Sequence, residues 1–229
     1  MTPTESRADS GTAWVAFPRQ YSFLKRLLDV TLCLALLPVA LVLLAVISVA
    51  IWLESPGPPV FLQVRIGLHG RPFRLYKFRT MTHGYDDREA RQFMKAYVRG
   101  EVGGRVSDGA AAVYKPNLDQ HLTRVGRFLR KTSLDELPQV LNVLKGDMSL
   151  VGPRPHVAWE VEEYRPWHRR RLDVLPGITG LAQVRGRSGI SFDRMVRYDL
   201  QYVDERSPML DMKILWRTLR AVARGQGAA

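Results

Sequence analysis

Cysteine is almost absent from this chain, which carries Cys33 alone among its 229 residues. A single thiol excludes an internal disulfide and any cysteine-based metal cluster. Histidine is also sparse, and no two histidines stand at the spacing of metal ligands. We therefore interpret the histidines as ordinary polar residues; they are His69, His83, His121, His156 and His168.

Acidic residues are few relative to basic ones. The chain has 22 Asp and Glu against 34 Lys and Arg, a formal net charge of +12, and a pI near 10.2. This excess predicts an anionic partner, whether nucleic acid, anionic lipid or a phosphorylated substrate, although solubility alone is another interpretation. A membrane-associated, non-enzymatic nucleic-acid-binding protein is the competing class. It would need aromatic side chains stacked beside basic ones on one face, and no known nucleic-acid-binding motif is present.

Long apolar runs are limited to one, residues 27–53, where Asp29 is the only charge and Pro38 the only proline. As a helix this run would reach roughly 40 Å at ~1.5 Å per residue, more than the ~30 Å hydrocarbon core of a bilayer. The run is too long, and starts too late, for a cleavable signal peptide. We therefore predict a helix that inserts into a membrane.

Whether this helix spans the membrane or turns back is a separate question. Basic residues flank both ends, so the positive-inside rule assigns neither end to the outside. Pro38 removes a backbone donor from the middle of the run and can bend it. These features favour a re-entrant helix with both ends in the cytoplasm, and a tilted transmembrane span is the alternative. The flanking residues are Arg19, Lys25 and Arg26 before the run, and Arg65, Arg71, Arg74, Lys77 and Arg79 after it.

The rest of the chain mixes strand and helix signals. Residues 60–66 and 72–78 are typical of two strands, and the glycines of the turn between them predict a hairpin. The pattern predicts helices near 86–99, 138–145, 156–170 and 191–205, a short amphipathic segment at 122–129, and a last helix beginning at Ser207-Pro208. The last helix carries basic residues on one face, which suits either a membrane surface or water. The expected fold class is α+β and mainly helical, with amphipathic helices at the surface.

The adjacent carboxylates Asp135 and Glu136 are the strongest candidates for chemistry. One carboxylate can attack phosphorus as a covalent nucleophile, and its neighbour can hold a divalent metal that neutralises phosphate charge. A structural alternative is a capping box, in which Ser133 and Glu136 start a helix and Asp135 suits its dipole. Pro138 weakens that alternative, because it falls where a helix needs a backbone donor.

Two further segments have restricted or permissive backbones. Arg154 lies in Gly-Pro-Arg-Pro, and a stiff backbone would present its guanidinium for bidentate contact with phosphate. Residues 176–187 contain three glycines, which let a backbone approach a ligand closely. Each segment taken alone is also compatible with an ordinary turn.

Together, six ordered segments between residues 25 and 216 resemble the bacterial sugar transferases, the monotopic phosphoglycosyl transferases that start the assembly of surface glycans. Two of the segments flank the apolar run, one covers the end of the predicted hairpin, and the other three contain the carboxylate pair, Arg154 and the glycines of residues 176–187. The segments are Lys25-Arg26-Leu27-Leu28-Asp29, Ser55-Pro56-Gly57-Pro58, Tyr76-Lys77-Phe78-Arg79-Thr80-Met81, residues 132–139, residues 146–155 and residues 176–187.

The resemblance implies a reaction. Members of this family move a sugar-1-phosphate from a UDP-sugar to a polyprenyl phosphate, usually undecaprenyl phosphate, and release UMP. This step initiates exopolysaccharide, capsule, O-antigen or glycoprotein glycan synthesis at the bacterial inner membrane, with the active site facing the cytoplasm. The resemblance makes Asp135 the nucleophile that forms an aspartyl phosphosugar, and it places Mg²⁺ on Glu136 beside Asp135. An enzyme without a covalent intermediate, in which Asp135 only binds metal, is an alternative.

The resemblance also implies binding residues and domains. Arg154 matches a phosphate-binding arginine, Lys77 and Arg79 would contact phosphate or the membrane interface, and Gln183 and Arg187 would contact the nucleotide or sugar. We expect a disordered leader at 1–20, a re-entrant membrane helix at 21–54, a cytosolic catalytic domain at 55–224 and a tail at 225–229. The family's helix breaks at a Ser-Pro pair; this chain has Leu37-Pro38 instead, about one turn nearer the N-terminus. A homodimer is possible, nucleic acid is not an expected partner, and the segment 82–118 either shapes donor choice or is a passive loop.

Overall fold

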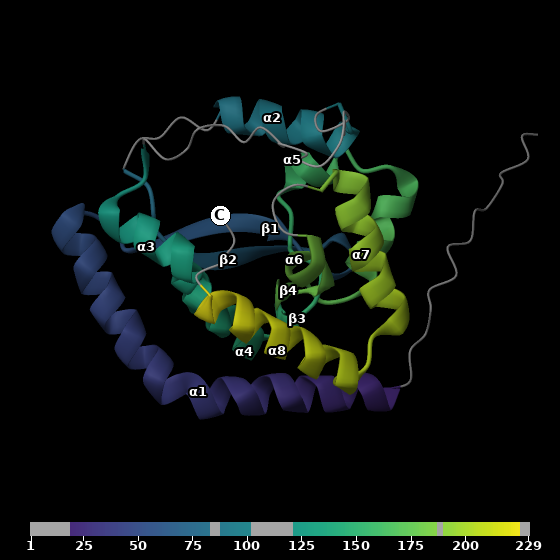
Figure 1. The fold of residues 1–229 in the computed structure, drawn as a ribbon, viewed down its shortest axis with the longest axis horizontal. Helices are drawn as coiled ribbons and strands as arrows, with labels where there is room; N and C mark the ends of the chain where they lie inside the picture. Colours follow the sequence, from purple (N-terminus) through teal and green to yellow (C-terminus); the bar gives the residue numbers. More distant parts are fainter. Residues whose placement is uncertain (1–18, 83–87, 102–120, 187–189, 225–229) are drawn as a thin grey trace, which may run out of the picture.

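The computed structural model describes residues 19–82, 88–101, 121–186 and 190–224. The predictions for residues 1–18, for the tail at 225–229 and for most of the segment 82–118 therefore lie outside the described residues. The chain folds into one long helix, α1 (Arg19–Glu54), set against a small domain of short helices and strands (Figure 1). The predicted fold class, α+β and mainly helical, is confirmed.

Helix α1 bends part-way along its length and follows two sides of the domain (Figure 1). Pro38 lies inside it, and its missing N–H removes one backbone hydrogen bond from the helix. The side chains of Cys33, Ala40, Ile47 and Ile51 are buried against the domain. Their spacing follows the helical period, so one face of α1 belongs to the core.

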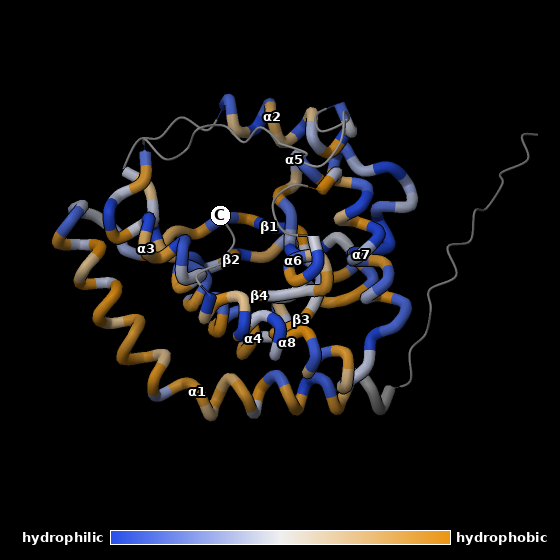
Figure 2. The backbone as a smooth tube through the Cα atoms, in the orientation of Figure 1, coloured by the Kyte–Doolittle hydropathy of each residue, from blue (hydrophilic) through white to orange (hydrophobic). Residues whose placement is uncertain are grey.

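The opposite face of α1 is apolar and uncovered. Among the described residues, only this helix is long and apolar enough to cross a membrane, and just 17% of its most apolar window is buried. A core helix of a soluble protein would be mostly buried, so this face needs an apolar environment. In Figure 2 hydrophobic residues colour most of the length of α1. Its exposed large side chains include Leu34, Leu36, Val39, Leu41, Val42, Val46 and Val49.

The first turns of α1 are bound to the domain by charged side chains. The Nζ of Lys25 lies 2.8 Å from Oδ2 of Asp211. The guanidinium of Arg26 donates to the carbonyl oxygens of Val143 and Leu144, at 2.5 and 3.0 Å. These carbonyls lie in the last turn of a short helix, where free acceptors need outside donors. The carbonyl of Val143 also accepts from the N–H of Gly146 at 3.0 Å, and Arg26 adds a second donor there.

The last turn of α1 is bound to the same domain. The carboxylate of Glu54 accepts hydrogen bonds from the backbone N–H groups of Arg124 and Val125, at 2.7 and 2.8 Å. These groups are free donors at the first turn of α3 (Arg124–Thr132), and a carboxylate there also complements the helix dipole. Both ends of α1 are therefore fixed to one domain.

The predicted hairpin is confirmed. Strand β1 (Val60–Ile66) pairs antiparallel with β2 (Pro72–Phe78), and the turn between them contains a short 3-10 helix at Leu68–Gly70. A second, parallel pair was not expected from the sequence: β3 (Ser149–Val151) lies beside β4 (Gly177–Thr179). Gly177 makes this pair possible, because a Cβ there would lie 2.0 Å from the backbone nitrogen of Gly152.

The helices agree with the sequence in part. Helices α2 (Arg88–Arg99), α7 (Phe192–Glu205) and α8 (Pro208–Ala223) lie close to the predicted ranges. The single helix expected at 156–170 is wrong, because Pro166 interrupts it and leaves the preceding residue extended. The remaining helical elements are 3-10 helix η3 (Leu134–Gln139), α4 (Val140–Lys145), α5 (Ala158–Val161), 3-10 helix η4 (Pro166–Asp173) and α6 (Leu181–Gly186).

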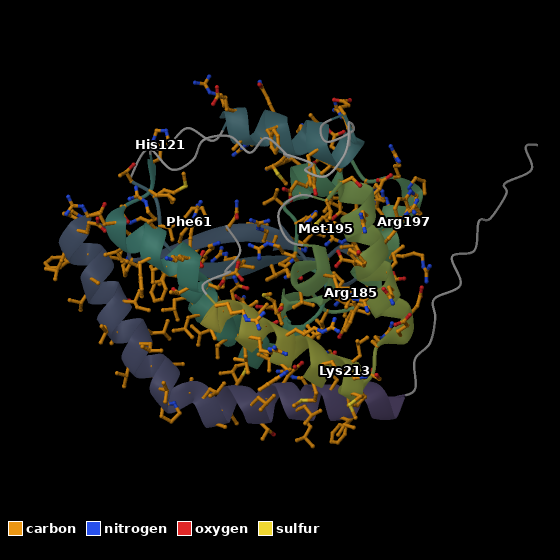
Figure 3. All side chains as sticks on the ribbon, in the orientation of Figure 1. Phe61, His121, Arg185, Met195, Arg197 and Lys213 are labelled. Carbon is orange, nitrogen blue, oxygen red and sulfur yellow. The ribbon has the colours of Figure 1, made fainter. Side chains whose placement is uncertain are left out.

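The core is shared between the membrane-seeking helix and the domain. Ile47 and Ile51 of α1 pack against Phe78 of β2 and Leu129 of α3. Figure 3 shows side chains filling the space between α1 and the elements above it. Strand β2 and helix α3, which lead to the site described next, are therefore positioned by contact with α1.

Candidate active site

The carboxylate pair follows the end of a helix and is not part of a capping box. Helix α3 ends at Thr132, and Ser133 adopts a left-handed conformation with φ of 57°. Its side chain makes no capping hydrogen bond to η3, which begins at Leu134. The capping-box alternative is therefore wrong, because a residue at φ of 57° is not the extended residue that an N-cap requires.

Two basic side chains from distant segments meet the carboxylates. The Nζ of Lys77, on β2, lies 2.7 Å from Oδ2 of Asp135 and 3.7 Å from Oε1 of Glu136. The Nη2 of Arg154, in the loop after β3, lies 2.7 Å from the same Oε1. Asp135 is buried. Four of the predicted site residues thus form one cluster, which we call the dyad cluster: Lys77, Asp135, Glu136 and Arg154.

The charges of the dyad cluster keep Glu136 ionised. Burial pushes the pKa of Glu136 upward, but Arg154, Lys77 and Arg65 outweigh burial and bring the pKa below its ordinary value. The pKa of Arg154 is raised, chiefly because Glu136 stabilises its charge. At neutral pH the cluster therefore holds a charged carboxylate against a charged guanidinium.

The dyad cluster also offers oxygen ligands of the kind that Mg²⁺ prefers. Magnesium usually takes one or two carboxylates from the protein and completes its shell with phosphate oxygens and water. Asp135 and Glu136 supply two adjacent carboxylates. No group of three or more His, Cys, Asp or Glu side chains gathers among the described residues. These two residues therefore fit a magnesium ion that is shared with a phosphorylated substrate.

Comparison with known proteins places the chain in a family. A family model described as bacterial sugar transferase matches residues 20–225. The chain belongs to the bacterial sugar transferase family. This membership confirms the resemblance drawn from the six segments, and it groups the chain with enzymes, not with the nucleic-acid-binding proteins that were the competing class.

Several curated relatives are similar to this sugar transferase. An uncharacterized sugar transferase of Bacillus subtilis, EpsL, is 43% identical over 204 residues, which is 89% of each chain. The galactosyl transferase CpsE of Streptococcus agalactiae is 44% identical, over 91% of this chain and 44% of its own length. The undecaprenyl-phosphate galactose phosphotransferase of Salmonella typhimurium is 39% identical, over 92% of this chain and 42% of its own length. The sugar transferase thus spans less than half the length of the last two relatives.

Arg79 of this sugar transferase makes its described hydrogen bonds outside the dyad cluster. Its guanidinium donates to the carbonyl oxygens of Ser55 and Pro56, directly after the membrane helix. Gly57, at φ of 126°, leaves room for this contact, since a Cβ there would lie 2.6 Å from Nη1 of Arg79. The contacts bind Arg79 to the exit turn of the helix, and its phosphate-binding role stays a prediction.

The predicted contacts of Gln183 and Arg187 with the nucleotide or sugar stay predictions. Gln183 lies on α6, and its Nε2 donates to the carbonyl oxygen of Ile178 at 3.4 Å. Its Oε1 is buried and has no hydrogen-bond partner among the described residues. Arg187 lies outside the described residues. Both roles stay predictions.

Sequence reasoning missed a group of buried polar residues behind Arg154. Arg65 donates from Nη1 to the carbonyl oxygen of Pro155 at 3.1 Å, and burial lowers its pKa to about 10. Arg171 donates from Nη2 to the carbonyl oxygen of Arg154 at 3.0 Å. His156, which was interpreted as an ordinary polar residue, is buried beside them. The only signal in the sequence was a run of three arginines at 169–171, which does not reveal which one turns inward.

Proposed function

We propose that this protein transfers a sugar-1-phosphate from a UDP-sugar to a polyprenyl phosphate, undecaprenyl phosphate, and releases UMP. The observation that carries the proposal is the carboxylate pair, with Asp135 buried and Glu136 partly buried, in contact with Lys77 and Arg154. The names of the relatives support it. One from Caulobacter vibrioides, 41% identical over 85% of this chain and 68% of its own length, is a UDP-glucose:undecaprenyl-phosphate glucose-1-phosphate transferase.

The proposed reaction has two displacements at phosphorus. In the first, an Oδ atom of Asp135 attacks the sugar-proximal phosphorus, the bond to the bridging oxygen breaks, and UMP leaves with that oxygen. In the second, an oxygen of the polyprenyl phosphate attacks the same phosphorus and releases the carboxylate of Asp135. The product is a polyprenyl diphosphate sugar, and no oxidant or reductant is needed.

Lys77 and Arg154 supply positive charge to both steps. Their side chains are 25% and 39% exposed, so solvent and substrate can reach them. A donor diphosphate would compete with the carboxylates for these cations. Phosphoryl transfer depends largely on positioning and charge neutralisation, which this exchange of partners provides. When bound at Asp135 and Glu136, Mg²⁺ would neutralise further charge on the diphosphate.

We also propose that α1 is re-entrant and that the domain lies on the cytoplasmic side of the bacterial inner membrane. The support is geometric: Lys25 and Glu54, at opposite ends of the helix, both bind the same domain. A straight transmembrane span would place its two ends on opposite faces of the bilayer. Pro38 supplies a bend in the middle of the apolar run.

Helix α8 supports the same placement. Its exposed apolar side chains are Met209, Met212, Trp216 and Leu219, spaced by three or four residues so that they share one face. Ile214, on the inner side, is buried. An exposed apolar stripe beside basic residues suits a membrane interface, so we favour the membrane-surface interpretation of this helix over the solvated one. A homodimer stays a prediction.

The test is UMP release by the full-length protein in vesicles that contain undecaprenyl phosphate, with Mg²⁺ and a panel of UDP-sugars. The curated names of relatives with 38–41% identity include galactose, N-acetylgalactosamine and glucose donors, so the panel should contain all three. We expect UMP release with at least one donor and none from Asp135→Asn. Equal rates in the two proteins would refute the covalent mechanism.

A further inference from the structure

The loop that carries Arg154 has few donors of its own. Pro153 and Pro155 lack a backbone N–H, so this segment is held mainly through its carbonyl oxygens. Three consecutive carbonyls, of residues 153, 154 and 155, each accept a hydrogen bond from another segment. The donors are, in order, the backbone N–H of Gly177 at 2.9 Å, Nη2 of Arg171 at 3.0 Å and Nη1 of Arg65 at 3.1 Å.

Arg171 is the most deeply buried of these donors. Its side chain is 2% exposed, and its Nη2 lies 2.5 Å from Oδ2 of Asp199, which is 1% exposed. Asp199 belongs to α7, so one nitrogen of Arg171 joins α7 to the Arg154 loop. Buried ion pairs contribute little net stability, because both partners lose their hydration. Net stability therefore does not explain the pair, whereas its contact with the Arg154 loop indicates a role in holding that loop.

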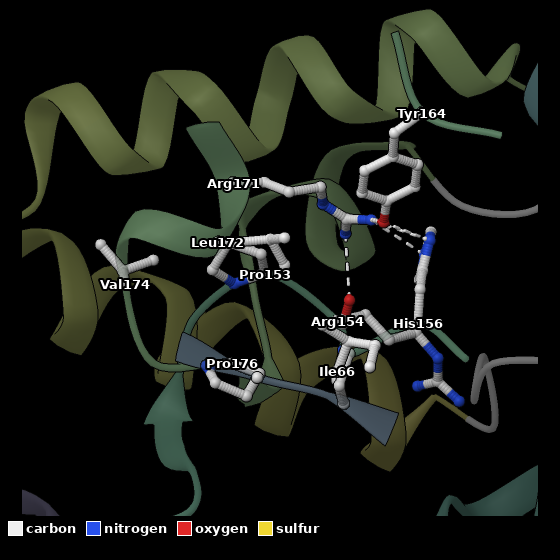
Figure 4. Close-up of a pocket in the computed structure, with 11 residues that line it drawn as sticks. Ile66, Pro153, Arg154, His156, Tyr164, Arg171, Leu172, Val174 and Pro176 are labelled. Atoms are coloured by element: carbon white, nitrogen blue, oxygen red, sulfur yellow. Dashed lines mark hydrogen bonds between the residues drawn. The ribbon is translucent and has the colours of Figure 1, made fainter. Parts of the chain in front are cut away.

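The other side of the Arg171 guanidinium is held as well. Its Nη1 donates to the hydroxyl of Tyr164 at 2.6 Å and lies 2.9 Å from Nδ1 of His156 (Figure 4). Burial, reinforced by Arg171, holds the pKa of His156 well below its usual range, so the ring is neutral. The adjoining cavity has a volume of only about 10 Å³, room for roughly one water. Arg171 consequently has little space for an alternative position.

We propose that Arg171 is a positioning residue that sets the place of the Arg154 guanidinium beside Glu136. The chain of contacts runs from Asp199 through Arg171 to the carbonyl of Arg154, and from the Arg154 side chain to Glu136 at 2.7 Å. Arg171 does not itself reach the carboxylates; it acts through the backbone of its neighbour. The kinetic consequence of this inference rests on the proposed function.

The first test compares two neighbouring arginines of η4. Arg170 pairs with Asp204 of α7 at 2.6 Å and is 42% exposed, whereas Arg171 pairs with Asp199 of the same helix and also binds the loop. We expect Arg171→Met to lower kcat/KM for the UDP-sugar about 30-fold and Arg170→Met to change it less than about 2-fold. Arg171→Lys should fall between Arg171→Met and wild type, since an ammonium can pair with Asp199 but lacks the fork that serves both partners.

A second test asks whether Arg171 acts through Arg154. In the Arg154→Ala background, Arg171→Met should add less than about 3-fold to the loss, because the side chain that it positions is gone. Losses that multiply in the double variant would overturn the proposal, since Arg171 would then act independently of Arg154.

A third readout does not depend on turnover. Amide hydrogen exchange of the peptide 150–157, measured on the membrane-embedded protein, should be faster in Arg171→Met and Arg171→Lys than in wild type or Arg170→Met. Absence of turnover by wild type with every donor would refute the proposed function, and the exchange data would still test the positioning role. If Arg171→Met does not fold, Arg171→Lys decides. Wild-type exchange and wild-type kcat/KM in folded Arg171→Lys would overturn the inference.

Discussion

The protein contains two clusters built from the same chemical groups, arginine or lysine against carboxylate, and they differ in access. In the dyad cluster the cations Lys77 and Arg154 are partly exposed. In the second cluster, which we call the buried clamp, Arg171 and Asp199 are almost fully enclosed. An exposed cation can exchange its carboxylate partner for a phosphate, whereas an enclosed one cannot. Similar ion pairs thus suit two tasks, one in binding substrate and one in holding a loop.

The largest expected difference between the clusters comes from the same substitution made in each. Asp135→Asn should reduce turnover by about 10⁴-fold or more, because an amide is a poor nucleophile, and it should leave the unfolding free energy nearly unchanged. Asp199→Asn should lower the unfolding free energy by about 3 kcal/mol, since it leaves Arg171 buried beside a neutral partner. UMP release and chemical denaturation of both variants check this contrast. Comparable stability losses in the two would remove the distinction.

Arg154 connects the clusters, and its removal should have the next largest effect. Arg154→Met should reduce turnover by about 10²- to 10³-fold, the loss typical of one preorganised charge donor. Its unfolding temperature should fall only by a few degrees, because the side chain is partly exposed and Lys77 still faces Glu136. Steady-state kinetics and a thermal melt test this prediction, and a large fall in unfolding temperature with little kinetic effect would contradict it.

The pH dependence of the unfolding free energy tests the charge of Glu136 in the dyad cluster. Its folded pKa lies below the ordinary value of 4.5, so its ionised form stabilises the native state at any pH above that value. This contribution is lost as the pH falls through the lower, folded pKa. The unfolding free energy of wild type should therefore exceed that of Glu136→Gln at neutral pH, and the gap should shrink below about pH 4.5. A gap that widens with acid would show that the pKa is raised.

The smallest effect is expected far from both clusters. Trp216→Gln, on the exposed stripe of α8, should weaken co-sedimentation with anionic vesicles about 2- to 5-fold, because α1 supplies most of the membrane affinity. Turnover per membrane-bound molecule should not change. Arg170→Met is the matched surface control, and an equal loss of binding in that variant would count against a role for the stripe.

Local signals in the sequence were enough for some of this architecture. The hairpin followed from two strand-like runs around a turn, and the start of α8 followed from Ser207 and Pro208. The Ser207 hydroxyl does accept a hydrogen bond from the N–H of Leu210. In contrast, β3 and β4 are three residues long and pair across a distant part of the chain. No local sequence pattern predicts so short a strand, because its pairing depends on the tertiary fold.

The candidate site shows the same division. Lys77, the carboxylate pair and Arg154 could be predicted because each lies in a segment that resembles the family. The buried clamp could not, since Arg171 and Asp199 stand 28 residues apart and each is surrounded by other charged residues in the sequence. Packing decides which arginine of a run turns inward, and the single helix expected at 156–170 did not predict the separate 3-10 helix η4 that carries Arg171.

The attachment of α1 at both ends also determines how the protein can be truncated and purified. Ile47 and Ile51 complete the hydrophobic core around Phe78 and Leu129, and Glu54 caps α3. A fragment cut after Glu54 would expose that core to water and lose the cap, so it should aggregate instead of giving a soluble enzyme. Helix α1 is thus a structural part of the domain, and we expect that any purification has to carry the two together in detergent or lipid.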